Sequence, residues 1–358
     1  MRLVWWWLLC CASYVAAWGS TGHEIVATIA QSFLDSSVRS YLCTLLPSSS
    51  QYEAAWPGVH NQTQCHLADI ATWADRVRIR MPWTSKWHYV NAVGDHPPTT
   101  CDFGSQGFHS SKHILNILPS MTHLFQEHAH RKAALRFMTH LVGDLHQPLH
   151  IVGRAHGGNF IRVRFGDKHA NLHKVWDTHM LERRIEQLSN YSVPLDRPAW
   201  ATALRGTKYD AYVRWILVEG LGQGTDAPVH PRWPDWREWT TCPSQPMHIA
   251  GVSDPTPSAK GPMCPLAWAS EMHAMGCRYA FAYPVPGSTL NMLSWVLAIL
   301  PGVVKSPDVA IPVYLDPVYE NMVLEKALAM AGVRLAYILN TLFYREARAQ
   351  YSMWMITA

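Results

Sequence analysis

The chain of 358 residues is 48% hydrophobic and only 16% charged. This balance excludes an intrinsically disordered protein and provides enough apolar sequence for a large core. Lys and Arg number 30 against 26 Asp and Glu, so the formal net charge of +4 is too small for a protein dedicated to wrapping DNA. The 20 histidines favour metal binding, because neutral imidazole is the commonest metal ligand.

The start of the chain predicts a secretory signal peptide at residues 1–17. Arg2 supplies a positive charge, an apolar run follows at 3–14, and Ala17 is a small residue that suits a cleavage site. A membrane anchor is the alternative, but the apolar run is shorter than the roughly 20 residues that span a bilayer. Cleavage after Ala17 would make Trp18 the mature N-terminus. We therefore expect a secreted protein without a transmembrane helix.

The hydrophobic pattern of the mature chain predicts mostly helices. Apolar residues recur at helical spacing at 22–34, 67–78, 112–126 and 132–146. Pro148 ends the last of these helices. Residues 160–165 alternate apolar and charged side chains and precede a Gly-Asp turn, which is typical of a strand in a β-hairpin.

The C-terminal half continues the helical pattern. Helices are predicted at 171–186, with Asn171 as N-cap, and at 198–221, 264–282 and 316–347, whereas 222–263 is interpreted as a loop rich in Pro and Trp. The apolar segment 290–304 is too short to span a bilayer and is interpreted as a packed or interfacial excursion. No linker divides the chain. We therefore predict one all-α domain at 18–350 with a small β-hairpin, and a tail at 351–358.

Six cysteines remain after removal of the signal peptide, and none lies in a Cys-x-x-Cys pair. An even number in an exported chain favours three disulfides over a thiolate metal site. Six cysteines allow fifteen pairings, which spacing alone does not distinguish. The arrangement that we predict is Cys43–Cys65, Cys101–Cys277 and Cys242–Cys264. Two sequons, at Asn61 and Asn190, predict surface glycosylation.

The strongest chemical signal is the segment HLVGDLHQPLH, which begins at His140. His140 and Asp144 are four residues apart, so both project from one helical face and can bind one ion. Pro148 breaks the helix and can turn His150 towards the same pocket. His146 lies on another face of the helix and is left out of the site.

The same spacing recurs at His173 and Asp177. One such pair alone is more often a polar helix face or a buried structural histidine, but two pairs with His150 between them favour a metal site. Asp75, late in an apolar helical stretch, and His88, in an aromatic, strand-like run, offer the same kinds of donor. Each of these two alone also fits a solvated or a structural role.

The mature N-terminus supplies further donors. The α-amine of Trp18 has a reference pKa of about 8 and can lose its proton to a metal. Its carbonyl would close a five-membered chelate, and His23 would reach the same ion. The nine candidates are all nitrogen or oxygen donors, which suits Zn²⁺ in open catalytic geometry. They are Trp18, His23, Asp75, His88, His140, Asp144, His150, His173 and Asp177.

Together these residues resemble the zinc-dependent class I nuclease family, the S1/P1-type single-strand nucleases and 3′-nucleotidases. The matching segments are WGSTGHEIVATIA at 18–30, ATWADRVR at 71–78, WHYVN at 87–91, HLVGDLHQPLH at 140–150, GGNFI at 157–161 and NLHKVWDT at 171–178. The resemblance implies the all-α fold that these nucleases share with bacterial zinc phospholipases C. Those phospholipases usually have HxxxE at the last ligand pair, where this chain has HxxxD.

The resemblance also implies three zinc ions per chain. The first would use Asp75, His88, His140 and Asp144, the second Trp18, His23 and Asp144, and the third His150, His173 and Asp177. Asp144 would thus join two ions that hold a nucleophilic hydroxide, while the third ion would stabilise the departing 3′ oxygen.

Five other residues gain roles from the resemblance. Arg78 resembles the arginine that contacts the phosphate, and Tyr89 resembles the aromatic side chain that stacks on the base. Asn159 resembles a pocket residue that supports the third zinc site. Asn91 stands where many relatives have Asp, so it can orient a water molecule but not deprotonate it. His179 stands where relatives often have Asn, which bears on base preference.

These features predict a secreted zinc endonuclease that cleaves single-stranded DNA and RNA to 5′-phosphate products and also acts on 3′-nucleotides. A zinc-dependent phospholipase C is one alternative, because segment 290–304 could contact lipid. A non-enzymatic secreted zinc-binding protein is the other. We expect a monomer without a stable protein partner.

Overall fold

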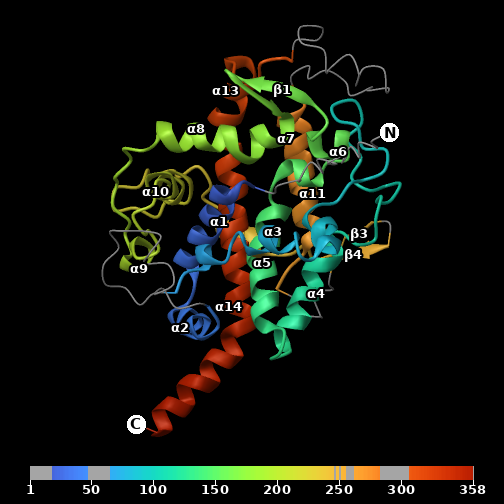
Figure 1. Cartoon of the computed structure of the whole chain (residues 1–358). Coiled ribbons are helices and arrows are strands. Elements are labelled where there is room, and N and C mark those ends of the chain that lie inside the picture. The colour runs from blue at the N-terminus through green and yellow to red at the C-terminus, as the bar shows by residue number, and fades with distance from the viewer. Residues whose placement is uncertain are drawn as a thin grey trace, which may run out of the picture.

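The computed structural model describes residues 18–46, 65–245, 247–249, 251–254, 262–282 and 306–357. As the sequence predicts, the fold is mostly helical (Figure 1). A long helix, α14 (Val323–Thr357), runs through the middle of the molecule. The helices α1 (Ser20–Phe33) and α2 (Ser36–Leu45) pack on one side of α14, and α5 (Arg131–Leu145) packs on the other.

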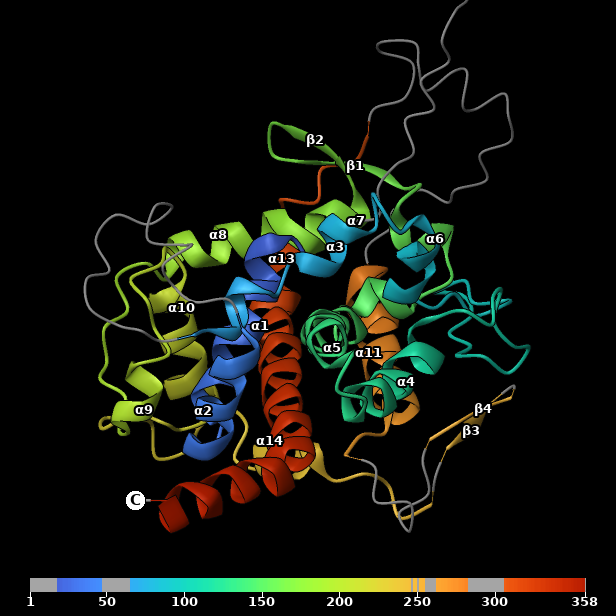
Figure 2. The same ribbon diagram turned by 60° about the horizontal axis from the view of Figure 1, so that its bottom comes forward.

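Two outer groups of helices complete the packing. The helices α4 (Ile114–Gln126) and α11 (Pro265–Met275) lie against α5 on the side away from α1, as Figure 2 shows. On the opposite side, α9 (Pro198–Ala201) and α10 (Asp210–Trp215) cover α1. The helices α1 and α5 are thus enclosed on both sides, and both carry residues of the predicted metal site.

The predicted hairpin and the helix after it are confirmed. Strand β1 (Arg162–Phe165) pairs antiparallel with β2 (Lys168–Asn171), with Gly166 at a φ of +61° in the turn. The Asn171 side chain accepts a hydrogen bond from the Lys174 N–H at 2.7 Å and caps a continuous helical run. This run consists of α7 (Leu172–Lys174), a π-helical turn η5 (Val175–His179) and α8 (Met180–Gln187).

The run that carries His173 and Asp177 is anchored by a buried tryptophan. Trp176 is completely buried, and its indole N–H donates to the Tyr314 hydroxyl at 2.8 Å. That hydroxyl in turn donates to the Ala280 carbonyl at 3.1 Å. Burial of a large apolar side chain stabilises a fold by roughly 1.5–3 kcal/mol, and here its polar end is also satisfied. The position of Asp177, the next residue, is therefore well defined.

Three of the predicted helices are interrupted. The segment 67–78 divides into η2 (Leu67–Asp69) and α3 (Trp73–Val77). The segment 198–221 divides into α9 and α10, which continues as a π-helical turn, η6 (Ile216–Gly220). The segment 316–347 is split between α13 (Pro312–Glu320) and α14, because Met322 adopts a φ of +50°.

The remaining predicted helices are confirmed with small shifts. They appear as α1, α4, α5 and α11, the last extended by a π-helical turn, η9 (Gly276–Ala280). The strand-like interpretation around His88 is wrong, because His88 ends a 3₁₀ helix, η3 (Pro82–His88). The predicted loop 222–263 contains a short helix, η7 (Trp236–Thr240), and the paired strands β3 (His248–Ile249) and β4 (Val252–Ser253). The segment 290–304 lies outside the described residues.

The predicted disulfides Cys43–Cys65, Cys101–Cys277 and Cys242–Cys264 are all present. The second joins the loop before α4 to η9, far apart in the sequence. Asn190 of one sequon is exposed, whereas Asn61 of the other lies outside the described residues. None of the described helices combines the length and the apolar character needed to cross a bilayer.

Candidate metal centre

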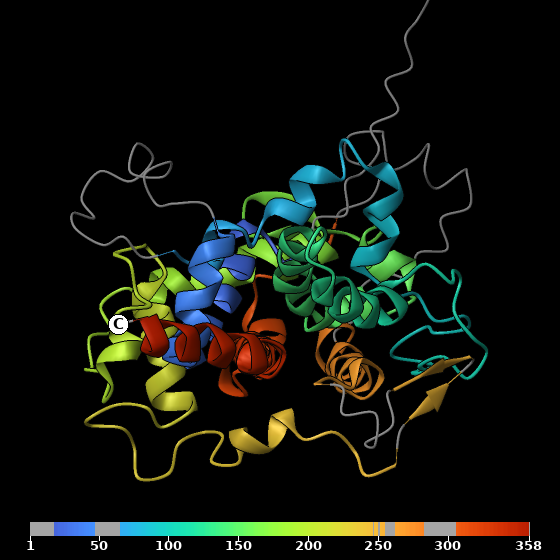
Figure 3. The same cartoon turned by 90° about the horizontal axis from the view of Figure 1, so that it is seen from below.

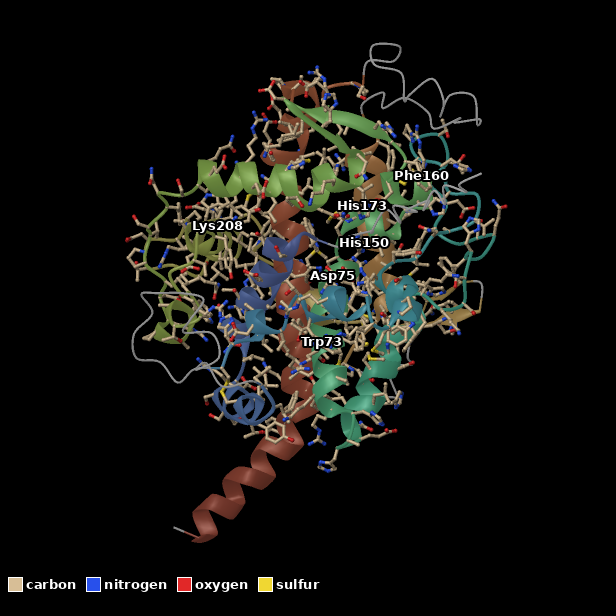
Figure 4. The ribbon with its side chains drawn as sticks, in the orientation of Figure 1. Trp73, Asp75, His150, Phe160, His173 and Lys208 are labelled. Atoms are coloured by element: carbon tan, nitrogen blue, oxygen red, sulfur yellow. A yellow bond between two sulfur atoms is a disulfide. The ribbon has the colours of Figure 1, made fainter. Side chains whose placement is uncertain are left out.

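The predicted ligands gather in the interior of the fold. Seven of them are at most 3% exposed, although they are polar: His23, His88, His140, Asp144, His150, His173 and Asp177. They come from α1, η3, α5, α7, η5 and a 3₁₀ helix after α5, η4 (Pro148–Ile151). Asp75 on α3 stands at the outer edge, and Figure 4 labels it together with His150 and His173. Polar side chains are costly to bury without partners, so their convergence requires an explanation.

Asp144 is the centre of the first group. Its Oδ1 lies 3.3 Å from His23 Nε2, and its Oδ2 lies 2.9 Å from His88 Nδ1 and 3.3 Å from His140 Nε2. His150 Nδ1 is also within 3.7 Å of its Oδ1. The two oxygens of one carboxylate therefore face different imidazoles, which is the geometry of a bridging ligand.

Asp75 joins this group from α3. Its Oδ1 is 3.9 Å from His88 Nδ1 and 3.7 Å from His140 Nε2, and Arg78 Nη2 lies 3.2 Å from the same oxygen. The break between η2 and α3 therefore matters for the site. It gives the short helix α3 its own orientation, and the Asp75 carboxylate on α3 completes the group.

A second group forms at the end of η4 and the start of α7. His150 Nε2 and His173 Nε2 are 3.2 Å apart, and His173 Nε2 lies 3.3 Å from Asp177 Oδ2. His173 and Asp177 are brought together by their spacing of four, as predicted. Pro148 opens η4 and places His150 opposite them, also as predicted.

Backbone carbonyls orient three of the imidazoles. The Nδ1 atoms of His140, His150 and His173 each lie 2.7 Å from a carbonyl oxygen, belonging to Ala71, His88 and Gly157 respectively. An Nδ1–H that donates to a carbonyl fixes the tautomer and leaves Nε2 with a free lone pair. In all three residues this Nε2 points into the cluster. Metal-ligating histidines are typically held in this way.

Several buried atoms that face the cluster make no hydrogen bond within the described part of the chain. His23 Nε2, Asp75 Oδ1 and Asp144 Oδ1 are buried without a hydrogen bond. A buried polar atom without a partner costs roughly 1–3 kcal/mol. Since these atoms are nitrogen and oxygen donors directed at one another, they fit a divalent cation of the zinc type better than they fit each other.

Electrostatics support the same interpretation. Burial alone would lower the pKa of His140, but the carboxylates of Asp144 and Asp75 outweigh it and raise this pKa to about 9. Burial would raise the pKa of Asp144, yet His140 and the other imidazoles hold that pKa well below its usual range. Around Asp177 burial dominates and raises the pKa of the carboxyl. A cation beside Asp177 would favour its ionised form.

The segment 155–158 is strained where it supports His173. Ala155, His156, Gly157 and Gly158 all have φ values between +50° and +80°, in the left-handed region. A Cβ at Gly157 would lie 2.2 Å from the Leu149 carbonyl oxygen, so only glycine fits there. The Gly157 carbonyl accepts from His173 Nδ1, so this strained turn positions a candidate ligand.

Trp18 lies beside the cluster. Its side chain is completely buried, and the N–H of Gly19 donates to the Asp177 carbonyl at 3.0 Å. Residue 18 is therefore adjacent to the helix that carries the second group, whereas His23, one turn further on, faces Asp144. The role of the Trp18 amine as a ligand stays a prediction.

The residues expected to contact substrate occupy different positions. Arg78 is 9% exposed beside Asp75, and Tyr89 is half-buried directly after His88. Asn91 is half-buried, and its backbone carbonyl accepts from the His109 N–H at 3.1 Å. Arg78 and Tyr89 thus border the Asp75 side of the cluster.

Asn159 and His179 make contacts of another kind. The Asn159 amide donates to the His156 carbonyl at 2.8 Å, so it holds the strained turn. The His179 ring stacks on Phe165, and its Nδ1 lies 3.7 Å from Glu182. Burial lowers the pKa of His179. The predicted substrate roles of both residues remain predictions.

Two supporting residues were not predicted from the sequence. Gln147 is completely buried, and its amide N–H donates to Asp177 Oδ1 at 2.5 Å. Gly143 allows His23 to approach, since a Cβ there would lie 2.8 Å from His23 Nδ1. His146, which was left out of the site, is indeed structural. Its Nδ1 lies 2.7 Å from the Val142 carbonyl, and its Nε2 accepts from Arg334 at 2.9 Å.

A further group of residues of the types that bind metals has a structural role instead. It consists of Asp95, His273 and Cys277. Asp95 Oδ1 lies 2.9 Å from His273 Nε2, next to Cys277. Cys277 is bonded to Cys101 and has no thiolate to offer. The Asp95 carboxylate also accepts backbone N–H groups from Asp102 at 3.1 Å and Gly153 at 2.8 Å. Asp95 is thus satisfied without an ion and braces the loop around it.

The chain is similar to known nucleases. The sequence profile of the S1/P1 nuclease family matches residues 18–344. The chain is 36% identical to Nuclease P1 of Penicillium citrinum over 219 residues, which cover 58% of this chain and 74% of that protein. It is 27% identical to Endonuclease 2 of Arabidopsis thaliana over 349 residues, covering 93% and 92% respectively. It is 33% identical to Nuclease S1 of Aspergillus oryzae over 193 residues, covering 51% and 60%.

Proposed function

Because the chain belongs to the S1/P1 nuclease family, we propose that it is an endonuclease that hydrolyses phosphodiester bonds of single-stranded DNA and RNA and leaves 5′-phosphate ends. It also removes the phosphate from 3′-nucleotides. The observation that carries this proposal is the arrangement of His23, His88 and His140 around one buried carboxylate, Asp144. A hydrolase of this family is metal-dependent, and these residues form the kind of group that holds a metal.

The metal is proposed to be zinc, with three ions per chain. The Asp75–His88–His140–Asp144 group and the Trp18–His23–Asp144 group would hold two of them, and the His150–His173–Asp177 group would hold the third. When bound, zinc lowers the pKa of a water molecule so that it becomes a nucleophile near neutral pH.

The protein's own side chains would orient the substrate. Arg78 carries its charge at the edge of the cluster, 3.2 Å from Asp75, where a phosphate can meet it. Tyr89 follows the ligand His88 and can stack on an unpaired base, a contact worth roughly 1–3 kcal/mol. Paired bases do not present a free face to an aromatic ring. A preference for single strands follows.

Asn91 limits how water is activated. An amide can accept or donate a hydrogen bond and thus orient the nucleophile, but it cannot take a proton from it. The proton of the attacking water must therefore be accepted by a group other than Asn91. We propose that Asn91 positions water, and that Asn159 and His179 line the substrate side of the site.

The remaining features of the proposal concern the protein outside the site. Residues 1–17 would direct secretion, and the protein would act as a monomer without a stable protein partner. The relatives named above are nucleases, so neither a phospholipase C nor a non-enzymatic zinc-binding protein is favoured over a nuclease.

The proposal is tested with a labelled oligonucleotide presented alone and annealed to its complement, and with a 3′-nucleotide. We expect cleavage of the free strand to 5′-phosphate products, release of phosphate from the 3′-nucleotide, and at least roughly tenfold slower cleavage of the duplex, the factor that corresponds to about 1.4 kcal/mol of base stacking. A zinc-loaded protein that cleaves neither single-stranded substrate would disprove the proposal.

Two variants probe the site within the same assay. Asp144→Asn should abolish activity, because Asp144 faces both metal groups on its side of the cluster. Asp177→Asn should leave a measurable rate, because it disturbs one group only. The loss in Asp144→Asn should exceed the roughly 10–100-fold typical of a lost supporting contact. Equal residual rates in the two variants would contradict the bridging role of Asp144.

A further inference from the structure

The segment between the predicted ligands Asp75 and His88 leaves the candidate metal centre, is exposed along much of its length, and returns to the same group of ligands. Asp75 lies on α3, and His88 ends η3, so both ends of the segment 76–87 are attached to the same group of ligands. The cyan part of the ribbon that contains α3 lies at the edge of the molecule, outside α4 and α5 (Figure 3). The segment therefore combines a fixed position with access to solvent.

This segment is basic and lacks acidic residues. Between positions 76 and 94 the sequence has no Asp or Glu. Its cations are Arg76, Arg78, Arg80 and Lys86. Arg78 turns towards Asp75, whereas the other three are exposed. In the part of the chain that the structure describes, those three make no ion pair with a carboxylate, so their charges are directed at solvent.

Two apolar side chains interrupt the cations on the same segment. Ile79 is 72% exposed and Trp83 is 60% exposed, which makes them two of the most exposed large apolar residues of the described chain. We call Arg76, Ile79, Arg80, Trp83 and Lys86 the α3–η3 strip. An exposed tryptophan between unpaired cations is not needed for packing, so the strip has the composition of a binding surface.

The strip is continuous with the substrate side of the site. Trp83 precedes His88 by five residues of 3₁₀ helix, which at about 2.0 Å per residue places it roughly 10 Å along the helix axis. Stacked bases of one strand are about 3.4 Å apart, so this distance corresponds to about three nucleotides. Tyr89, the residue proposed to stack on the reacting base, comes directly after His88.

We propose that the α3–η3 strip is a second binding site for single-stranded nucleic acid, which holds the strand a few nucleotides away from the bond that is cleaved. Trp83 offers a face on which any base can stack, and Arg80 and Lys86 neutralise phosphates. This inference rests on the proposed nuclease function and deepens it. The protein would then favour polynucleotides over dinucleotides by their affinity for the strip.

A basic, aromatic surface could also bind an anionic membrane. Continuity with Arg78 and Tyr89 favours a nucleic acid strand, because such a strand must leave the metal centre along some part of the surface. The strip also includes only one aliphatic residue, Ile79, which gives little area for insertion into lipid. Membrane binding is therefore an outcome of the test rather than the proposal.

The test compares a dinucleotide with a 12-nucleotide single strand, using the zinc-loaded full chain. Trp83→Ala should raise KM for the longer substrate roughly tenfold, because it removes a stacking contact, with kcat unchanged and the dinucleotide unaffected. Trp83→Phe keeps a ring and should restore most of the affinity. Arg80→Gln with Lys86→Gln should lower the slope of log KM against log salt by about 1.4, since each phosphate contact on a single strand contributes about 0.7.

One control variant and three contrary outcomes complete the design. Lys132→Gln removes an exposed charge from the first turn of α5 and should change neither KM nor the salt slope. An unchanged KM for the longer strand in Trp83→Ala would overturn the inference while leaving the nuclease function intact. Failure of the wild-type protein to cleave the dinucleotide and the longer strand would instead refute the nuclease function. Phosphatidylserine vesicles that bind the wild type and not Trp83→Ala, with KM unchanged, would assign the strip to membranes.

Discussion

The amide of Gln147 connects the metal centre with the chain that follows it. Its N–H donates to Asp177 at 2.5 Å, and its oxygen accepts a hydrogen bond from the Leu149 N–H at the start of η4. One side chain therefore orients the carboxylate of the candidate ligand Asp177 and also fixes the turn that places His150. Hydrogen bonds of this kind keep a ligand in the geometry that the metal requires.

We predict that Gln147→Ala weakens metal binding at the group formed by His150, His173 and Asp177. The expected loss of affinity is roughly 10–100-fold, as is typical for a lost contact to a ligand, with a parallel loss of kcat at limiting zinc. Zinc titration followed by elemental analysis and activity measures both effects. Gln126→Ala, at the exposed end of α4, is the matched control. Unchanged affinity in Gln147→Ala would show that Asp177 needs no such support.

Residue spacing predicted which candidate ligands converge better than it predicted the residues that support them. His140–Asp144 and His173–Asp177 follow from helix geometry alone, because residues four apart share a face. The partner of Gln147 lies 30 residues away, and the need for glycine at 143 depends on the approach of α1. Such contacts depend on how the elements pack, which no local pattern in the sequence contains.

At the scale of elements, helical periodicity located the helices but not their interruptions. The predicted helix 198–221 is broken because Gly206 adopts a φ of +76° and the Asp210 carboxylate accepts the N–H groups of Gly206 and Thr207. A glycine and a capping Asp are local signals for such a break. The break at Met322, by contrast, puts a non-glycine residue at a φ of +50° and has no such signal.

The buried His66 connects the start of η2 with the segment after α9 and makes folding stability depend on pH. The Ala68 N–H donates to His66 Nδ1 at 3.0 Å, so Nε2 carries the proton and donates to the Ala203 carbonyl at 3.1 Å. A second proton would go to Nδ1 and would place the Nδ1–H of His66 opposite the Ala68 N–H, so that this hydrogen bond would be lost. Burial, with a further contribution from Arg205, lowers the pKa of His66 well below its usual range.

We predict that His66 destabilises the fold in acid. Below about pH 6.5 the unfolded histidine takes up a proton that the folded histidine refuses, so the free energy of unfolding falls as the pH decreases. Between pH 7.5 and 5.5 the loss from this residue is about 1.4 kcal/mol. His66→Asn keeps an acceptor for the Ala68 N–H and should reduce the pH dependence by that amount, as measured by urea unfolding at both pH values. The exposed His128→Asn should not.

The contact between α1 and α14 depends on a glycine. A Cβ at Gly332 would lie 2.5 Å from Ile29 Cγ2 and 3.1 Å from the Val26 carbonyl oxygen. Alanine in the middle of a helix normally stabilises by roughly 0.5–1 kcal/mol relative to glycine. We predict that Gly332→Ala nevertheless destabilises the protein by about 1–3 kcal/mol, because overpacking outweighs helix propensity. A thermal unfolding midpoint at or above that of the wild type would contradict this prediction.

At the scale of the whole molecule, the candidate metal centre forms because distant parts of the chain meet. The two groups draw on residues from position 23 to position 177, and α14 and the three disulfides hold the surrounding helices in place. The sequence predicted which residues would meet, through the repeated spacing and the family resemblance. It did not predict the path of the chain between them, such as the excursion of α3 and η3.

Cleavage at the predicted site before Trp18 would tie processing of the whole chain to the candidate metal centre. The family profile begins to match at Trp18, the residue that the predicted cleavage would expose. Trp18 is completely buried, and the next residue is hydrogen-bonded to the Asp177 backbone. A free α-amine has a lone pair for a metal at neutral pH, whereas an amide nitrogen does not. Cleavage would therefore create a ligand as well as remove a leader.

We predict that a form retaining Ala17 binds less zinc than a form that begins at Trp18 and is at least roughly tenfold less active, which corresponds to about 1.4 kcal/mol of lost stabilisation. The amide nitrogen of Trp18 would no longer coordinate, and the extra residue would have to fit beside a side chain that has no exposed surface. Elemental analysis gives the zinc content, and the rate on a 3′-nucleotide gives the activity. The same short extension placed after Ala358 should change neither quantity. Equal zinc content and equal rates in both forms would remove Trp18 from the set of ligands and leave His23 and Asp144 to hold the second ion.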